Sequence, residues 1–278
     1  MAHSSGTEHI SNIFEEEQSL LLEKIFSERG WDFRDYKSSS LKRRILKRLG
    51  AAGVSSFSDY RDLLDRDPSE YTRLFSNLTV KVSEFFREPN VFEFLDAELR
   101  REFSPDEGIR AWCCGCAHGE EAYSLAILLS EFLSEEGLRQ TKIFATDLDH
   151  EAIDAARRAR YREESVANVS AERMERFFFR DDGCRKVKYN IRNLVKFGAL
   201  DIVGSPSISK VKILFCRNVF IYFNKALQEK VFEKLDYALK PGGLLVLGKA
   251  EVVPSAFASG YVRYSSAGKG ISVYRKAE

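Results

Sequence analysis

The chain has 278 residues, of which 44% are hydrophobic and 31% charged, and its formal net charge is +1. This length allows one large domain, or a small domain beside a larger one, and the composition is typical of a globular protein. A net charge so close to zero creates no global field that would attract nucleic acid or an anionic membrane. No apolar run approaches the roughly 20 residues that span a bilayer. We therefore expect no nucleic-acid binding and no direct insertion into a membrane.

The five cysteines indicate a reducing environment. Their number is odd, and three of them crowd together at Cys113, Cys114 and Cys116, which is not a disulfide framework. Neighbouring cysteines of a strand point to opposite faces, so we interpret these cysteines as small apolar residues at a strand end and expect no metal. The segment Met1–Thr7 has no apolar core of a signal peptide. We therefore expect a cytoplasmic protein.

Residues 1–14 are expected to form a disordered or tag-like lead, followed by an N-terminal helical domain over residues 15–90. Leu41, Ile45, Leu46 and Leu49 recur at helical spacing and predict one buried face. Ser56 has the character of a helix N-cap, and Asp67-Pro68 interrupts the pattern before the next helix.

Beyond residue 91 the pattern changes to strands that alternate with helices. Expected strands at 109–114, 142–146, 211–216 and 244–247 are separated by helical patterns at 120–133, 151–160 and 225–239. This alternation predicts right-handed βαβ units and a doubly wound parallel sheet, that is, an α/β fold over residues 91–278. Segments 187–189 and 195–197 are expected to form short antiparallel strands of a small inserted β-subdomain at about 180–198. Residues 261–274 predict a final hairpin.

The turn after the first strand is suited to a ligand. It contains Gly115 and Gly119, and the next helix opens with Glu120 and Glu121. Glycine lets a ligand approach the backbone, and a helix N-terminus presents free N–H groups. Two carboxylates there would repel a pyrophosphate but suit a ligand with an ammonium and a sulfonium, such as S-adenosylmethionine. The alternative is that both acids only stabilise the helix N-terminus, by about 0.3–1 kcal/mol each.

The end of the second strand favours the ligand interpretation. This strand ends in Ala145-Thr-Asp-Leu-Asp149, and an acid at this position binds ribose hydroxyls in doubly wound folds. We interpret Asp147 as the ribose ligand and Asp149 as the N-cap of the following helix.

Four segments of the sequence form a distinctive set of motifs: Val82-Ser-Glu-Phe-Phe-Arg-Glu-Pro89, Gly119-Glu-Glu-Ala-Tyr-Ser-Leu-Ala126, Ala145-Thr-Asp-Leu-Asp149 and Phe215-Cys-Arg-Asn-Val-Phe-Ile-Tyr-Phe223. The last of them is followed by Leu239-Lys-Pro-Gly-Gly-Leu244. By these motifs the chain resembles, over residues 18–275, the chemotaxis-receptor protein-glutamate O-methyltransferases, the CheR family. The resemblance implies a class I, Rossmann-like methyltransferase with an all-helical N-terminal domain and an inserted antiparallel β-subdomain. It implies S-adenosylmethionine as cofactor and S-adenosylhomocysteine as product. The implied reaction is glutamate 5-O-methyl ester formation on chemoreceptors in sensory adaptation.

The resemblance also implies roles for individual residues. Glu120 would take the methionine amino group, Asp147 the ribose, and Asp201 with Ile202 the adenine; Arg217 and Asn218 would line the methionine and sulfonium end. Cofactor contacts are further implied for Lys81, Ser83, Arg87 and Gly115. The chain departs from the family at two of these positions, because the family commonly has Asn in place of Lys81 and Thr in place of Ser83.

Substrate glutamates are already ionised near pH 7, so no general base is required. Tyr222 is the candidate to orient the attacking carboxylate, or it is a core aromatic, and Arg87 is a second candidate for attracting that carboxylate.

A basic helix contains Arg43, Arg44, Lys47 and Arg48 with no acid. We interpret it as the docking site for the cytoplasmic Glu-rich helical region of the receptors, with a merely solvated face as the alternative. A monomer is expected. Two other functions stay open: a binding module without activity, and a methyltransferase for another substrate.

Overall fold

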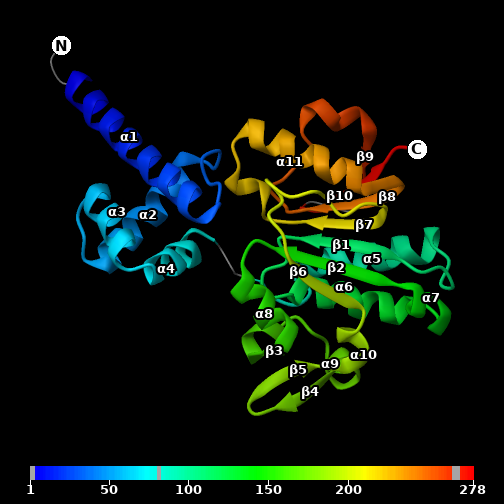
Figure 1. The fold of residues 1–278 in the computed structure, drawn as a ribbon. Coiled ribbons are helices and arrows are strands. Elements are labelled where there is room, and N and C mark those ends of the chain that lie inside the picture. The colour runs from blue at the N-terminus through cyan, green and yellow to red at the C-terminus, as the bar shows by residue number, and fades with distance from the viewer. Residues whose placement is uncertain (1–3, 80–82, 265–269) are drawn as a thin grey trace. The chain divides into compact units, whose positions relative to one another are not determined.

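The structure, a computed structural model, describes residues 4–79, 83–264 and 270–278, with side chains from Phe14 onward. The chain divides into two units (Figure 1): a helical unit of Met1–Val80 with Tyr222–Leu227, and an α/β unit of Lys81–Ile221 with Gln228–Glu278. The division falls ten residues before the expected boundary at residue 90. The first helix takes in most of the segment that we expected to be a disordered or tag-like lead, because its backbone is helical from Ser4.

The helical unit contains α1 to α4, which span Ser4–Arg29, Ser38–Ala52, Phe57–Arg66 and Ser69–Leu78. The predicted N-cap is confirmed, because the Ser56 side chain accepts a hydrogen bond from the Asp59 N–H at the start of α3. Helix α2 ends at Gly53, whose left-handed backbone (φ 74°) suits glycine. Local capping chemistry therefore defines two helix ends in this unit.

The buried face of α2 is narrower than expected. Leu41, Ile45 and Leu49 are buried, but Leu46 is 44% exposed, so the prediction for Leu46 was wrong. The three buried residues follow one another at i, i+4 and i+8, which defines a single stripe, and Leu46 lies one residue outside it. An apolar side chain is thus exposed beside the basic residues of this helix.

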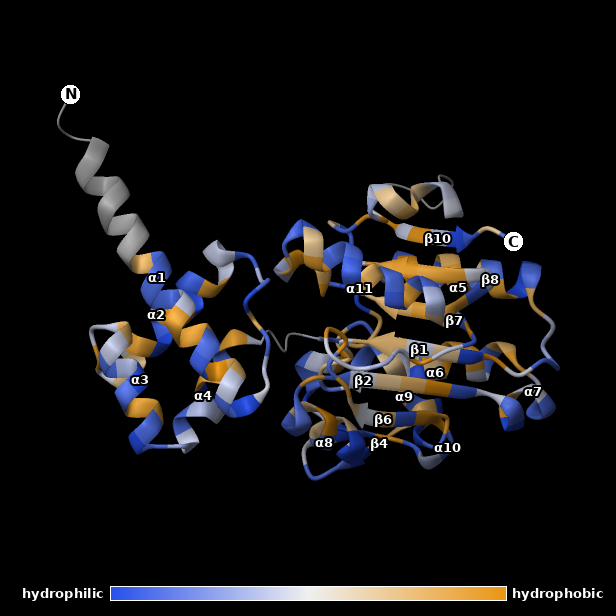
Figure 2. Cartoon of the chain, turned by 45° about the horizontal axis from the view of Figure 1, so that its top comes forward, coloured by the Kyte–Doolittle hydropathy of each residue, from blue (hydrophilic) through white to orange (hydrophobic). Residues whose placement is uncertain are grey.

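The α/β unit is built on a sheet with the strand order β6-β2-β1-β7-β8-β10-β9 among the described residues. These strands span Val195–Ala199, Lys142–Asp147, Arg110–Cys114, Val211–Cys216, Leu239–Leu247, Ser272–Lys276 and Tyr261–Arg263. The first five are parallel, whereas β10 pairs antiparallel with both β8 and β9. The expected C-terminal hairpin is therefore confirmed. Figure 2 shows hydrophobic colouring along the central strands β7 and β8, as expected for a sheet that is covered on both faces.

Helices connect and cover these strands. The helices of the α/β unit are α5 Pro89–Glu102, α6 Glu120–Phe132, α7 Glu135–Gln140, α8 His150–Arg158, α9 Ala171–Phe177, α10 Tyr189–Arg192 and α11 Lys225–Ala238. Helix α6 lies between β1 and β2 in the chain, and α8 between β2 and β6, and β2 and β6 are on one side of β1 in the sheet. Helix α11 connects β7 to β8, which are on the other side of β1. Right-handed crossovers therefore place α11 on the opposite face.

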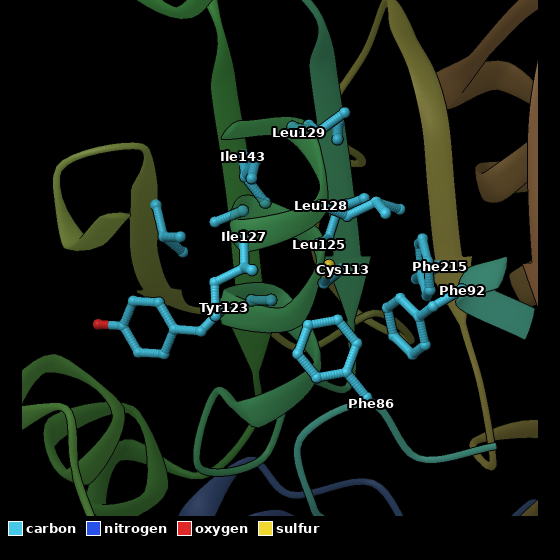
Figure 3. Close-up of a cluster of buried hydrophobic side chains, with 14 of the residues drawn as sticks. Phe86, Phe92, Cys113, Tyr123, Leu125, Ile127, Leu128, Leu129, Ile143 and Phe215 are labelled. Atoms are coloured by element: carbon cyan, nitrogen blue, oxygen red, sulfur yellow. The ribbon is translucent and has the colours of Figure 1, made fainter. Parts of the chain in front are cut away.

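One hydrophobic cluster joins the sheet to the helices on one face. Figure 3 shows Cys113, Ile143 and Phe215 of three neighbouring strands beside residues of α5 and α6 such as Phe92 and Leu128. All five side chains are at most 2% exposed. The packing of α6 against the sheet is what holds the N-terminus of that helix in place.

The inserted sheet lies earlier in the chain than expected. Its strand order is β3-β5-β4, with β3 Arg160–Tyr161, β4 Phe178–Asp181 and β5 Cys184–Val187, and all pairs are antiparallel. The strand predicted at 195–197 instead forms β6 of the main sheet and pairs parallel with β2. Its sequence favours an extended segment, but its partner is selected by tertiary packing.

The predicted fold class is confirmed: a helical unit, a doubly wound α/β sheet and a small antiparallel sheet. In the part of the chain that the structure describes, no helix combines the length and apolar character needed to cross a membrane.

Candidate functional site

The carboxyl ends of the parallel strands form the candidate site. Strands β6, β2, β1, β7 and β8 run in the same direction, so the loops that follow them emerge at one edge of the sheet. From β1 the chain continues to β2 and β6 on one side of the sheet, and later to β7 and β8 on the other side. This reversal places the topological switch point at β1. Ligands of open α/β sheets bind at this position.

The glycine loop after β1 is fastened to the end of β2. The N–H groups of Gly115 and Cys116 both donate to the Thr146 carbonyl, at 2.8 and 3.0 Å. Gly115 has a left-handed backbone (φ 72°), and a Cβ there would lie 2.6 Å from Val219 Cγ2. Only glycine allows the loops after β1 and β7 to approach this closely.

Asp147 ties the same loop to the end of β2 through its carboxylate. Its Oδ2 accepts from the Ala117 N–H at 2.8 Å and its Oδ1 from the Asp149 N–H at 3.0 Å. Asp149 caps α8 by accepting from the N–H groups of Glu151 and Ala152, so its predicted role as an N-cap is confirmed. Asp147 thus lies beside the glycine loop, as a ribose ligand must.

Glu120 is a buried acid at the N-terminus of α6. It is 3% exposed, and its Oε2 atom has no hydrogen-bond partner among the described residues. Burial raises the pKa of Glu120 to about 7, although a hydrogen bond from Ser83 opposes this shift. A buried carboxylate oxygen without a donor is costly unless a ligand supplies one. The ammonium group of S-adenosylmethionine fits this requirement.

Arg217 is fully enclosed between two acids. Its Nη1 donates to Glu121 Oε2 at 2.9 Å, and its Nη2 to Glu88 Oε2 at 2.7 Å and to the Arg87 carbonyl at 3.2 Å. Burial would lower the pKa of Arg217, but Glu121 and Glu88 outweigh it and raise the pKa. Sequence analysis assigned Arg217 to the cofactor; the structure shows that its guanidinium joins three segments of the α/β unit.

Glu251, which sequence analysis missed, lies after β8 and is 3% exposed. Its Oε2 accepts from the Gly248 N–H at 2.7 Å and from the Asn218 N–H at 2.8 Å. Asp147 was predicted because it is an acid at the end of a buried parallel strand. The same signal could have identified Glu251, which follows β8.

The loop after β6 contains Asp201 and Ile202, the predicted adenine contacts. The Asp201 side chain accepts from the Val203 N–H at 2.8 Å. Lys234 of α11, also missed, donates to the carbonyls of Ile202, Val203 and Ser205 at 2.7–3.0 Å. These three hydrogen bonds from one ammonium group hold the loop in one conformation.

The remaining candidates belong to the helical unit. Arg44 donates to the Leu78 carbonyl and lies over the Tyr222 ring, 4.8 Å from its centroid. Arg48 donates twice to the buried Glu70, at 2.5 and 2.7 Å, so its charge is already paired. Arg43 and Lys47 are exposed.

The structure thus separates the predicted site residues into two groups. One group lies in the α/β unit: Ser83, Arg87, Gly115, Glu120, Asp147, Asp201, Ile202, Arg217 and Asn218. The other lies in the helical unit: Arg43, Arg44, Lys47, Arg48 and Tyr222. Lys81 lies outside the described residues.

Comparison with known families gives two matches along the chain. Residues 81–264 match the CheR methyltransferase, SAM binding domain, and residues 16–79 match the CheR methyltransferase, all-alpha domain. These ranges follow the division into the α/β unit and the helical unit.

Individual relatives agree with the family matches. The chain is 31% identical to a chemotaxis protein methyltransferase of Escherichia coli (strain K12), over 82% of this chain and 81% of that protein. It is 32% identical to chemotaxis protein methyltransferase 2 of Pseudomonas aeruginosa, over 82% of this chain and 84% of that protein. It is 33% identical to an uncharacterized 104.1 kDa protein of Rhodobacter capsulatus, over 80% of this chain but only 24% of that protein. The chain belongs to the CheR methyltransferase family and is an S-adenosylmethionine-dependent methyltransferase of class I fold.

Proposed function

We propose that this enzyme methylates glutamate side chains of chemoreceptors, giving glutamate 5-O-methyl esters and S-adenosylhomocysteine in sensory adaptation. The observation that carries the proposal is the buried Glu120, one oxygen of which has no partner among the described residues. Glu120 lies at the switch point of a chain whose relatives are chemotaxis protein methyltransferases. The five cysteines are free thiols, which supports a cytoplasmic location. We further propose that the enzyme acts as a monomer.

The residues of the α/β unit would bind the cofactor. Glu120 in its ionised form accepts from the ammonium group, Asp147 from the ribose hydroxyls and Asp201 from the adenine amine. Arg87, Asn218 and Ile202 would complete the contacts. S-adenosylmethionine supplies a methyl group on a sulfonium, which a nucleophile displaces in line.

The substrate needs positioning and no proton removal. A glutamate side chain has an ordinary pKa of about 4.3, so it is ionised at neutral pH. Holding the carboxylate in line with the methyl group is then the main contribution of the protein. Tyr222 is the proposed group that orients the carboxylate, and Arg87 a second that attracts it.

The basic surface of α2 is the proposed docking site for the Glu-rich receptor helices. Arg43, Lys47 and Leu46 are all exposed on this helix. Arg44 and Arg48 were predicted to dock as well, but their bonds to Leu78 and Glu70 already hold them. We therefore propose that Arg43 and Lys47 supply most of the attraction for an acidic helix.

The proposed function is tested with radiolabelled S-adenosylmethionine and receptor-containing membranes. We expect label in the receptor band that base treatment releases as methanol, because esters hydrolyse and methylated amines do not. Base-stable label, or label in another macromolecule, would assign a different substrate. Cofactor binding without any transfer would identify a binding module.

Asp147→Ala should weaken S-adenosylmethionine binding by about 1–3 kcal/mol, because a charge-assisted hydrogen bond to the ribose is lost. Titration calorimetry measures the change. Asp154→Ala is a matched control, since Asp154 is an exposed acid of α8 that is paired with Arg157. Equal affinities for the wild type and Asp147→Ala would contradict the ribose assignment.

The double variant Arg43→Glu/Lys47→Glu should lower kcat/KM for receptor methylation about tenfold or more at low salt, with unchanged cofactor affinity. Its remaining activity should also depend less on salt. Lys142→Glu/Lys240→Glu makes the same change of charge at exposed residues near the amino ends of β2 and β8. If both double variants lose activity equally, the effect comes from net charge and the docking proposal fails.

A further inference from the structure

Glu251 holds the loop after β7 by hydrogen bonds from main-chain N–H groups. Its Oε2 accepts from the Gly248 and Asn218 N–H groups at 2.7 and 2.8 Å, and its Oε1 from the Ile221 N–H at 3.3 Å. The residue is 3% exposed. A buried carboxylate needs such donors, and it makes stronger bonds to them than a neutral acceptor would. One side chain therefore fastens both ends of the segment 218–221 to the end of β8.

The backbone around this carboxylate is closely packed. Asn218 has a left-handed backbone (φ 61°), a conformation that costs most residues about 1–2 kcal/mol and that Asn tolerates better. A Cβ on Gly248 would lie 2.6 Å from Glu251 Oε2 and 2.8 Å from the Asn218 nitrogen. The Asn218 turn is thus held in one conformation by Glu251 and by the close approach of Gly248.

The neighbouring residue is held independently. The Arg217 side chain is fixed by Glu121 and Glu88, whereas the Asn218 backbone is fixed by Glu251. Glu120 and Asp147, the proposed ammonium and ribose ligands, lie after other strands and have different hydrogen-bond partners. Loss of Glu251 should therefore free the segment 218–221 and leave the main cofactor ligands in place.

We propose that Glu251 is a positioning residue for methyl transfer, which acts by holding the backbone of Asn218 and Ile221 at the carboxyl edge of the sheet. The inference rests on the proposed function. Methyl transfer needs the reacting groups aligned, and a displacement of about 1 Å costs roughly 100-fold in rate. Turnover should therefore depend on Glu251 far more than cofactor affinity does.

The test compares Glu251→Ala and Glu251→Gln with Glu98→Gln. Glu98 is an equally buried acid of the same unit, 3% exposed and paired with Arg101 of the same helix. Turnover per folded molecule is measured at 15 °C with receptor-containing membranes, and the cofactor Kd by calorimetry. We expect kcat to fall about 10- to 100-fold in Glu251→Ala and less in Glu251→Gln, which keeps one acceptor oxygen. The cofactor Kd should change by a much smaller factor than kcat, because Asn218 is only one of the proposed cofactor contacts. Glu98→Gln should change neither quantity.

Gly248→Ala disturbs the same contact without removing the carboxylate, and it keeps the proposal testable if Glu251→Ala does not fold. We expect it to show the same loss of kcat with nearly unchanged cofactor Kd. If the Glu251 and Gly248 variants lose only thermal stability, or if kcat and cofactor affinity fall together, Glu251 has no positioning role. Failure of the proposed function would appear separately, as wild-type protein that does not methylate receptors.

Discussion

Glu120→Gln should weaken S-adenosylmethionine binding by about 2–3 kcal/mol, roughly 30- to 150-fold, and should make the ligand-free protein more stable at pH 8. The side chain is 3% exposed and one carboxylate oxygen has no partner among the described residues. Keeping the ionised form buried, with a pKa raised from 4.5 to about 7, costs ~3 kcal/mol. Gln carries no charge, so it avoids much of this cost but cannot pair with an ammonium.

The same variant should change how the stability of the protein and its cofactor affinity depend on pH. The unfolded chain has the ordinary pKa of 4.5 and the folded protein about 7, so the folded state binds more protons between these values. The cost of the buried charge is therefore absent below pH 4.5, grows as the pH rises, and is complete above about pH 7. Relative to Glu120→Gln, wild-type stability should fall over this window, whereas its cofactor affinity should rise until the carboxyl is ionised.

Calorimetric titrations and urea unfolding between pH 5.5 and 8.5 measure both effects. Ser83→Ala removes the hydrogen bond that favours the ionised form, so it should move the binding profile to higher pH. Glu121→Gln is not a suitable control, because Glu121 pairs with Arg217; Glu135→Gln, at an exposed acid in the first turn of α7, is a better choice. A pH-independent wild-type affinity would contradict the assignment of Glu120 to the ammonium.

Arg217→Met should lower the free energy of unfolding of the α/β unit by about 3–5 kcal/mol, because it leaves Glu121 and Glu88 without their shared cation. The Arg217 side chain is 2% exposed and bonds to both acids and to the Arg87 carbonyl. The Glu121 side chain, which is only 15% exposed, then loses the cation that compensates its charge in a region of low dielectric. The shift of the urea midpoint measures the loss.

Two companion variants sharpen this result. Arg217→Met/Glu121→Gln removes one of the stranded charges and should recover part of the stability. Arg139→Met breaks an ion pair whose cation is 67% exposed and should cost about 0–1 kcal/mol. If Arg217→Met and Arg139→Met unfold at the same urea concentration, the buried network contributes no more than a surface pair.

Local chemistry was predictable from the sequence. The strands β1, β2 and β7 and the helices α6 and α8 begin and end within two residues of their expected positions. The caps by Ser56 and Asp149 were also correct. Each of these features depends on residues a few positions apart, whose hydropathy and capping groups appear directly in the sequence.

Partners distant along the chain were not predictable in this way. The segment 195–197 reads as extended, but its pairing with β2 instead of the small antiparallel sheet depends on the packing of the whole unit. Arg48 reads as a docking cation, yet Glu70, 22 positions away, neutralises it. Leu46 reads as a core residue, yet it is exposed.

The sequence by itself determined the alternation of strands and helices, the glycine loop, the acids Glu120 and Asp147 and, by resemblance, the methyltransferase family. Only the tertiary structure decided what these groups contact. It buried Glu120 and left one of its oxygens without a partner in the described part of the chain. It also enclosed Arg217 between Glu121 and Glu88 and brought Glu251 to Asn218 across 33 positions. The physical reason is that periodicity and capping act between near neighbours, whereas burial and ion pairing depend on which surfaces the folded chain brings together.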